Sequence, residues 1–332
     1  MTSHAMSERR LRVAVWGLGR QAANRILPAM RAAAGVELYG VCSRNALTVA
    51  ETAAACTCRG WTDPTAMLSD PDVDAVFVAT PTGLHHEHGM QVLGARKHLW
   101  CEKPLTASLD HTLELLDLSR TLGLAVCEGF MYLHHPQFAA LSRFLTEERL
   151  GTLRSISCRF GLPTLEHPGF RSDPNLGGGA FLDLGCYLTS AILALLPDAR
   201  CDVRHAHIGH AEGSAVDTDG YAVIALSDGA VAQLEWRMNA GYRNEIEFWG
   251  ERGSLFADRV FSKPPDYIPE FLFRDARGNR AIEMGEAGDH FVLMIDAFRR
   301  MVANPSAIEA ERFCIARRAQ LLGSVRSLAQ RR

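Results

Sequence analysis

The first part of the chain, to about residue 130, alternates between short apolar runs and longer amphipathic stretches. The runs carry few charges, which is typical of strands that are covered on both faces. Each run precedes a stretch in which apolar residues recur with helical spacing. Such alternation predicts a doubly wound parallel sheet. Strands are expected at 11–16, 36–42, 74–79, 97–101 and 125–128, and helices at 20–30, 47–56, from 85 onward and 109–122.

Beyond Phe130 the pattern changes to longer strands joined by turns such as Ser227-Asp228-Gly229, which indicates an antiparallel sheet. The predicted fold class is therefore α/β, with an N-terminal Rossmann domain over 1–128 and a C-terminal α+β domain over 129–332. The second domain is expected to bind substrate and, through its mostly antiparallel open-faced sheet, to form a dimer or tetramer, since large apolar faces are rarely left in water. Its strands are expected at 153–160, 202–207, 221–226 and 231–238, and its helices at 181–196, 288–303 and 308–330.

Composition narrows the classes of partner. The chain has 332 residues, of which 47% are hydrophobic and 22% charged, with a formal net charge of -3. This balance offers no basic field for nucleic acid or anionic lipid, so a small-molecule partner is expected. The apolar stretch 180–196 is broken by Asp183 and glycines and is expected to be too short and too polar to span a membrane. The first ten residues lack the apolar core of an export signal, which predicts a cytoplasmic location.

The nine cysteines are scattered and odd in number. Cys56 and Cys58 form the only close pair, and their spacing fits no common zinc or redox motif. Free thiols in a reducing compartment and no metal site are expected.

A glycine turn after the first strand carries the clearest chemistry. Residues 17–22 read Gly-Leu-Gly-Arg-Gln-Ala, which matches the dinucleotide-binding fingerprint. Gly17 permits the tight turn, Gly19 lets the backbone approach a pyrophosphate, and Ala22 lets the helix pack closely on the sheet. The helix that follows offers its unpaired N–H groups to phosphate, so Leu18, Arg20 and Gln21 are predicted to line the cofactor.

The residues at the end of the second strand indicate which dinucleotide the chain binds. Chains that bind NAD usually carry an acid there, but this chain has Ser43 and Arg44. A hydroxyl and a guanidinium suit a 2′-phosphate, which favours NADP. The alternative is a solvated arginine in a surface loop.

A second polar group lies where another strand ends, at Glu102-Lys103-Pro104. Ligands of open parallel sheets collect at the carboxyl ends of the strands. A lysine beside a cofactor can donate to a carbonyl oxygen that becomes an alkoxide, and Glu102 could orient it. An exposed ion pair of little energetic value is the alternative.

Taken together, these motifs resemble the glucose-fructose oxidoreductase, inositol dehydrogenase and rhizopine-catabolism protein family (Gfo/Idh/MocA). The resemblance covers most of the chain and rests on residues 17–22, 80–85, 102–104 and 177–187. It implies that Lys103 is the catalytic lysine and that Asp183 and Tyr187 face the nicotinamide from the second domain. It also implies that Thr80, Pro81, His85 and Glu102 border the cofactor.

Asp183 and Tyr187 are separated by one helical turn and are expected on one face. Tyr187 stands where inositol-type members carry histidine, so their Asp-His base pair does not transfer directly. A tyrosine, with an unperturbed pKa near 10, is a poor base at neutral pH but can protonate a forming alkoxide. The substitution favours carbonyl reduction, although a plain core role for Tyr187 is also open.

The surrounding phrases 128–132 and 170–174 narrow the resemblance to NADPH-dependent sugar 3-ketoreductases, which reduce a TDP-linked keto-deoxysugar in deoxysugar pathways of antibiotic biosynthesis. The same segments also resemble dihydrodiol and xylose dehydrogenases of the family. Lys103, Asp183 and Tyr187 are expected to contact the sugar. Further candidates for the substrate or its diphosphate are Arg171, Arg237, Asn239 and Tyr242. Arg171 is also expected to contact the cofactor.

Three other functions remain open at this point. Oxidation of a free sugar or cyclic diol with NADP would need a base, for which His85, His134 and His135 are candidates. A glycoside hydrolase that recycles bound NAD is opposed by Ser43 and Arg44. A non-catalytic NADPH-binding regulator would have no need for the catalytic set.

Overall fold

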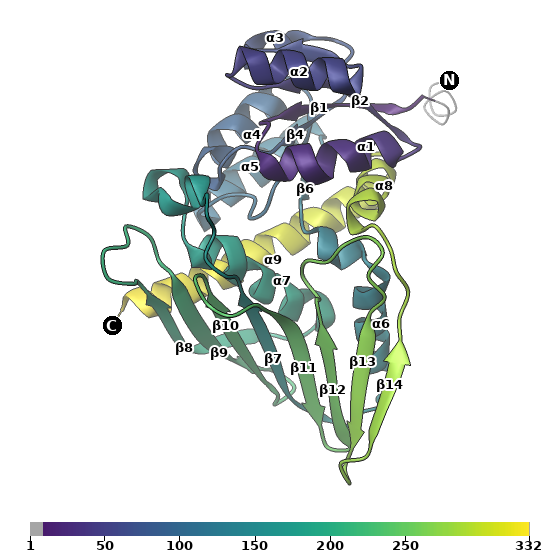
Figure 1. Cartoon of the computed structure of the whole chain (residues 1–332), viewed down its shortest axis with the longest axis vertical. Helices are drawn as coiled ribbons and strands as arrows, with labels where there is room; N and C mark the ends of the chain where they lie inside the picture. Colours follow the sequence, from purple (N-terminus) through teal and green to yellow (C-terminus); the bar gives the residue numbers. More distant parts are fainter. Residues whose placement is uncertain (1–8, 332) are drawn as a thin grey trace. The chain divides into compact units, whose positions relative to one another are not determined.

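The computed structural model describes residues 9–331 (Figure 1). The chain forms two compact units. The first runs to Gly129 and takes in Phe291–Ala316, and the second joins Phe130–His290 to the C-terminal segment from Arg317. The expectation drawn from residues 1–10, that no export signal is present, falls largely outside the described residues.

The first unit contains a six-stranded sheet in the order β3-β2-β1-β4-β5-β6, with all neighbours parallel. The predicted doubly wound parallel sheet is thus confirmed. Five strands lie within a residue or two of the predicted ranges, and β3 was not predicted. The strands are β1 (Leu11–Trp16), β2 (Val36–Cys42), β3 (Arg59–Trp61), β4 (Ala75–Val78), β5 (His98–Cys101) and β6 (Val126–Glu128).

Helices cover both faces of this sheet, as its uniformly apolar strands require. Trp100 packs edge-on against Phe77 and stacks on Phe298, whose helix α8 therefore lies on one face. Leu99, the next residue, joins a core cluster on the opposite face, to which α9 contributes Ile315. The helical segments are η2 (Ala22–Ile26), α1 (Leu27–Ala32), α2 (Ala46–Cys56), α3 (Pro64–Ser69), η3 (Thr82–Leu84), α4 (His85–Gly94), α5 (Leu109–Leu122), α8 (His290–Val302) and α9 (Pro305–Gln330).

One segment lies elsewhere than the sequence suggested. The sequence assigned all of 129–332 to the second domain, whereas the contacts of Phe291–Ala316 are with the first unit. The physical reason is the burial of Phe298 and Ile315, each about 1% exposed, against the parallel sheet.

The second unit contains an eight-stranded sheet in the order β14-β13-β12-β11-β7-β10-β9-β8. Every pair is antiparallel except β7 with β10, so the mostly antiparallel sheet is confirmed. Figure 1 shows the strands side by side, from β8 at one edge of the sheet to β14 at the other. They are β7 (Leu153–Gly161), β8 (Cys201–Gly209), β9 (Asp219–Leu226), β10 (Val231–Arg237), β11 (Arg243–Gly250), β12 (Gly253–Asp258), β13 (Glu270–Asp275) and β14 (Arg280–Met284).

One face of this sheet is covered by helices. Phe181 packs on Trp236 of β10, and Phe144 packs edge-on against Phe271 of β13. These contacts place the two main helices of the unit over the same apolar layer. The helical segments are η4 (Met131–His134), α6 (Pro136–Thr146), η5 (Gly169–Ser172), η6 (Pro174–Leu176), the π-helical η7 (Phe181–Gly185) and α7 (Cys186–Leu195).

The helical stretch Pro174–Leu195 is long and apolar enough to cross a membrane by length and composition alone, which corrects the expectation that it is too short and too polar. However, 89% of its apolar window is buried inside the protein, as in a core helix. None of the nine cysteines, all of which lie in the described part of the chain, is in a disulfide bond. Within residues 9–331, no group of three or more His, Cys, Asp or Glu side chains is arranged to hold a metal ion.

Candidate functional site

The glycine turn follows β1 and is fixed by its neighbours. Gly17 has φ of 108° and donates its N–H to the carbonyl of Cys42 at 2.9 Å. A Cβ at Gly17 would lie 2.8 Å from the backbone of Ala79, so only glycine fits there. A Cβ at Gly19, in contrast, would meet no atom within 4 Å. The space beside Gly19 suits a phosphate group, while Ala22, buried at 1% exposure, packs the helix on the sheet.

The helix behind this turn begins at Arg20, and its first turn faces solvent. Gly19, Arg20 and Gln21 are exposed, and Leu18 is half-buried. The carbonyl of Gly19 accepts the N–H of Ala23 at 3.0 Å, which leaves earlier N–H groups of the helix outside its own ladder. This is the arrangement that the sequence predicted for binding a pyrophosphate.

Ser43 and Arg44 lie where β2 ends. Ser43 is half-buried and donates its N–H to Trp61 at 3.2 Å, while Arg44 is exposed. The charge of Arg44 reaches His88, whose pKa is lowered by burial first and also by Arg44. His88 in turn bonds through Nδ1 to Thr80 Oγ1 at 2.9 Å. The ends of β2 and β4 therefore bring Arg44 and Thr80 into one polar neighbourhood.

His85 is buried and connects the loop after β4 with the loop after β5. Its Nε2 lies 2.8 Å from the carbonyl of Thr80 and its Nδ1 3.0 Å from the carbonyl of Pro104. The ring is 1% exposed, and burial lowers its pKa. Pro81, between Thr80 and η3, accepts the N–H of Leu84 at 2.9 Å. His85 thus supports the residues expected at the cofactor and cannot reach substrate as a base.

The loop after β5 is held by both neighbouring strands. Glu102 donates its N–H to Val78 of β4 at 2.9 Å, and Leu105 donates its N–H to Glu128 of β6 at 2.7 Å. Lys103 lies between these anchors, half-buried, with its N–H 3.4 Å from Oε2 of Glu102. The Lys103–Pro104 peptide bond is cis. Glu102 and Lys103 therefore stand at the end of a buried strand, as predicted.

In the second unit, Arg171 and Asp183 form one ion pair. Nε of Arg171 donates to Oδ2 of Asp183 at 2.6 Å, and the Asp183 side chain is 11% exposed. The sequence had treated the two separately, with Arg171 assigned to a phosphate. Gly178 explains the close approach, because a Cβ there would lie 2.5 Å from the carbonyl of Arg171.

Asp217 fixes the start of the helix that carries Asp183. Its Oδ2 accepts the N–H of Phe181 at 2.6 Å, and its carbonyl accepts the N–H of Ala180 at 2.9 Å. A Cβ at Gly179 would lie 2.1 Å from Oδ1 of Asp217. Burial raises the pKa of Asp217. Sequence reasoning missed this residue, since no local pattern reveals a cap supplied from so far along the chain.

Tyr187 lies on α7 within an aromatic cage. Its ring packs edge-on against Phe130 and Phe160, with centroids 5.5 and 5.3 Å apart, and is 6% exposed. Its hydroxyl donates to the thioether sulfur of Met131 at 3.6 Å, which is a weak acceptor. Asp183 lies in the π-helical η7, so the regular α-helical spacing assumed from the sequence does not hold between the two residues.

The remaining substrate candidates lie where β10 ends and β11 begins. Arg237 is exposed and 3.7 Å from Asp219, and Asn239 is exposed with a left-handed φ of 57°. Tyr242 is 43% exposed and accepts a hydrogen bond from Nδ2 of Asn244 at 2.9 Å. Arg237 is thus paired with an acid, whereas the ring of Tyr242 is exposed and its hydroxyl is held by Asn244.

His135, one of the candidate bases, is buried. Its Nδ1 accepts the N–H of Gln137 at 2.9 Å. Burial, together with the charge of Lys263, lowers the pKa of His135 to about 4. A group of that pKa, without solvent access, is a poor general base at neutral pH.

A glycine turn at the end of the first strand of a parallel sheet, followed by an exposed helix start and by polar groups at three further strand ends, defines a dinucleotide-dependent oxidoreductase. The comparisons with known proteins give the family. The model described as "Oxidoreductase family, NAD-binding Rossmann fold" matches residues 11–130, and the model of the GFO/IDH/MocA C-terminal domain matches residues 138–256. The chain belongs to the Gfo/Idh/MocA family, as the resemblance indicated.

Curated relatives and solved structures are similar over most of the chain. A dTDP-3,4-didehydro-2,6-dideoxy-alpha-D-glucose 3-reductase of Saccharopolyspora spinosa is 34% identical over 77% of both chains. A D-xylose 1-dehydrogenase (NADP(+)) of Haloferax volcanii is 29% identical over 71% of this chain and 72% of its own. The crystal structure of KijD10, a 3-ketoreductase from Actinomadura kijaniata in complex with NADP and TDP-benzene, superposes with a TM-score of 0.92, at 31% identity, over 96% of this chain and 98% of that one.

Proposed function

We propose that this protein reduces the 3-keto group of a TDP-linked keto-deoxysugar with NADPH, as a C-3 ketoreductase of deoxysugar biosynthesis. The names of the 3-reductase and of KijD10 support the substrate class and the cofactor. The observation that carries the proposal is the hydroxyl of Tyr187, which donates to the thioether sulfur of Met131 at 3.6 Å, a weak acceptor. A phenol whose proton is held by so weak an acceptor can give that proton to a forming alkoxide.

The residues of the first unit fit the cofactor. Gly19 leaves open the space that a pyrophosphate needs, and Gly17 lets the turn pass Ala79. Arg44 and Ser43 would hold the 2′-phosphate, which is why NADPH is preferred in the proposal over NADH. Thr80, Pro81 and Glu102 would border the nicotinamide end.

When bound, NADPH supplies the hydride that adds to C3 of the sugar. Tyr187 then gives its hydroxyl proton to the oxygen that was the ketone, so that an alcohol forms and the nicotinamide is left oxidised. Lys103 would polarise the same oxygen and share in its protonation. Asp183, held by Arg171, orients the sugar hydroxyls.

The first unit is proposed as the dinucleotide-binding domain, and the second as the domain for substrate binding and self-association. Trp249 of β11 and Ile282 of β14 are 65% and 59% exposed. A sheet bearing such residues supports a homo-oligomer formed through the second unit. A cytoplasmic location is proposed with the deoxysugar function.

The experiment that tests the function is single-turnover oxidation of NADPH with a freshly generated TDP-3-keto-deoxysugar, comparing the parent with Lys103→Ala and Tyr187→Phe. Oxidation by the parent that falls at least about 100-fold in both variants, with NADPH binding unchanged, is expected if each group acts on the reacting oxygen. No oxidation by the parent would reject the ketoreductase.

The similarity to the D-xylose dehydrogenase supports a second candidate, NADP-dependent oxidation of a free sugar. That reaction needs a base, whereas His85 and His135 are buried with lowered pKa values. Reduction of NADP by free aldoses or cyclic diols, in an enzyme inert toward the TDP-linked ketone, would favour this candidate.

A further inference from the structure

An arginine that the sequence did not single out stands apart from the others near the ends of β7, β10 and β11. Arg171 pairs with Asp183, Arg237 with Asp219, and Arg243 with Glu245 at 3.1 Å. Arg259, half-buried just after β12, forms no salt bridge with any carboxylate in the described part of the chain. Its guanidinium instead lies against two aromatic rings.

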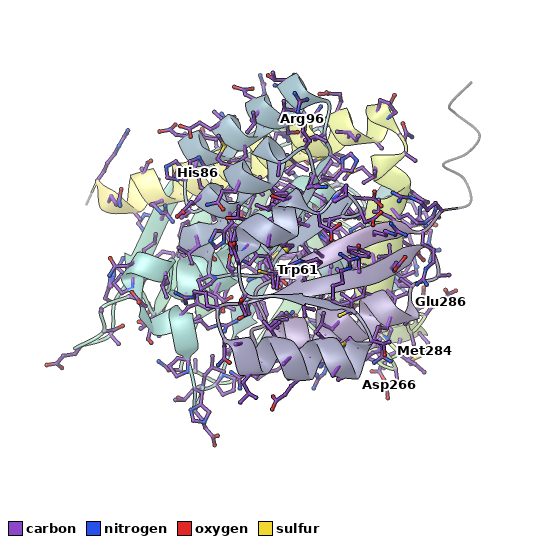
Figure 2. All side chains as sticks on the ribbon, turned by 90° about the horizontal axis from the view of Figure 1, so that it is seen from above. Trp61, His86, Arg96, Asp266, Met284 and Glu286 are labelled. Carbon is purple, nitrogen blue, oxygen red and sulfur yellow. The ribbon has the colours of Figure 1, made fainter. Side chains whose placement is uncertain are left out.

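Those rings are Tyr242 and Tyr267. The Cζ of Arg259 lies 5.4 Å from the centroid of Tyr242 and 5.8 Å from that of Tyr267, within the range of cation–π contacts. The loop that carries Tyr267 can be found in Figure 2 by its labelled neighbour Asp266. Arg259 has a left-handed φ of 49°, uncommon for a residue with a side chain, and its N–H bonds to Oδ1 of Asp258 at 2.7 Å.

The cluster is anchored from within the protein. Asn244 is fully buried, and its Nδ2 donates both to Tyr242 Oη at 2.9 Å and to the carbonyl of Ser262 at 2.7 Å. Its Oδ1 accepts the N–H of Phe261 at 2.7 Å. An exposed aromatic ring held this firmly loses little freedom when a ligand stacks on it.

Asn244 also links the cluster to Tyr187, through Phe261. Phe261 stacks on Phe160 and packs against Tyr187, with ring centroids 5.2 and 5.9 Å apart. Asn244 thus joins Tyr242 to Phe261, and Phe261 in turn packs against Tyr187. The cluster and Tyr187 are therefore connected within the second unit, as is required of a subsite for the remote part of a substrate whose sugar lies at Tyr187.

We propose that Tyr242, Arg259 and Tyr267 form the subsite for the nucleoside diphosphate of the substrate. An unpaired guanidinium is matched to diphosphate oxygens, and a tyrosine face is matched to a pyrimidine base. The inference rests on the proposed function and revises its details, since it gives the diphosphate to Arg259 in place of Arg171 or Arg237. Asp258 and Glu270 are the acids that act on Tyr267, and both are exposed, so solvent screens them.

The test is calorimetric binding of TDP, thymidine and inorganic pyrophosphate to the full chain in the presence of NADP. Arg259→Gln is expected to weaken TDP and pyrophosphate binding by about 10- to 100-fold, because a charge-assisted hydrogen bond is lost. Tyr242→Leu is expected to weaken TDP and thymidine by about tenfold without affecting pyrophosphate. Tyr242→Phe keeps the ring and is expected to bind TDP within about threefold of the parent.

A matched control variant is Arg280→Gln, which removes an exposed arginine on β14 and should leave TDP binding unchanged. In turnover, Arg259→Gln should raise KM for the TDP-sugar with kcat kept, as expected when uniform binding is lost. Normal TDP binding by Arg259→Gln in an active ketoreductase would overturn the subsite alone. A parent that neither binds TDP nor reduces the TDP-linked ketone would overturn both proposals.

Discussion

Nε of Arg171 lies 2.6 Å from Oδ2 of Asp183, so the carboxylate at the start of the central helix is held by a residue from the preceding 3₁₀ turn. The pair is mostly shielded from water, with the Asp183 side chain 11% exposed. Removal of either partner leaves a poorly solvated charge, whereas removal of both does not.

A double-mutant cycle measures this coupling. Arg171→Leu and Asp183→Leu are each expected to lower the free energy of unfolding by about 1–3 kcal/mol, and the double variant by clearly less than the sum. Urea unfolding of the four proteins provides the values. Additive losses would show that the pair does not stabilise the fold. Arg171→Lys should restore stability only in part, because lysine lacks the directed Nε–H.

The two glycines of the turn provide a matched pair for separating folding from cofactor binding. Gly17→Ala is expected to cost on the order of 2–4 kcal/mol, because its φ of 108° and the backbone of Ala79 oppose a Cβ. Gly19→Ala meets no protein atom within 4 Å and should leave the melting temperature unchanged. Its added methyl group should nevertheless raise the Kd for NADPH more than about tenfold, by blocking the pyrophosphate.

Fluorescence titration with NADPH and thermal unfolding together check this pair. Tight NADPH binding by Gly19→Ala would mean that the pyrophosphate lies elsewhere. Loss of folding in that variant would contradict the open space beside Gly19.

Arg44 is expected to set the choice between the two nicotinamide cofactors. Arg44→Ala should reduce kcat/KM for NADPH by about 10- to 100-fold and leave that for NADH nearly unchanged, since only the 2′-phosphate loses a partner. Ser43→Asp should lower the preference for NADPH further through repulsion. Arg120→Ala, which removes an exposed arginine on α5, is the control. An unchanged ratio in Arg44→Ala would assign the 2′-phosphate to another group.

Lys263 makes stability depend on pH in a defined direction. The residue is 5% exposed, donates to the carbonyl of Val260 at 2.7 Å, and has its pKa lowered by burial from 10.5 to about 7. The unfolded chain therefore binds more protons than the folded chain between about pH 7 and pH 10.5, and Lys263 makes the protein more stable as pH rises through that window. Below about pH 7 the amine is protonated in both the folded and the unfolded chain, so the full free-energy cost of burying its charge remains.

Lys263→Met is expected to raise the free energy of unfolding at pH 7 by a few kcal/mol, and the gain should shrink toward pH 10. Urea unfolding at both pH values, with parent and variant side by side, gives the difference. The parent must be measured beside the variant because buried thiols change stability in the opposite direction. Burial raises the pKa of Cys42 to about 12, so the protein becomes less stable as rising pH ionises this thiol in the unfolded chain. A gain that does not change with pH would contradict the assignment to Lys263.

The Rossmann sheet could be predicted from the sequence because its signals are local. A strand such as β1 is buried on both faces and reads as an uninterrupted apolar run, and the glycines of the turn report their own backbone geometry. The strand β3 escaped prediction because Arg59 and Gly60 are exposed, so no apolar run marks it. Its place in the sheet depends on pairing with Gly40 and Val41.

The candidate site could be predicted only as far as each residue carries its own chemistry. Lys103 and Tyr187 could be named because family motifs mark them. The bond of Asp217 to Phe181, the bond of Glu128 to Leu105 and the contact of Arg259 with the ring of Tyr242 arise from tertiary contacts between separate segments. Of these residues, only Glu128 could have been singled out from the sequence, because it is an acid at the end of an apolar strand.

The membership of Phe291–Ala316 in the first unit has a consequence for the way a ribosome would make this protein. Domains generally fold as they emerge, N-terminal part first. Here the Rossmann sheet would leave the exit tunnel with Trp100 bare, because Phe298 is synthesised only after the whole second sheet. The nucleotide-binding half, although its translation starts first, therefore cannot complete its core until the second sheet has been made, and a nascent chain stalled before α8 should remain dependent on chaperones.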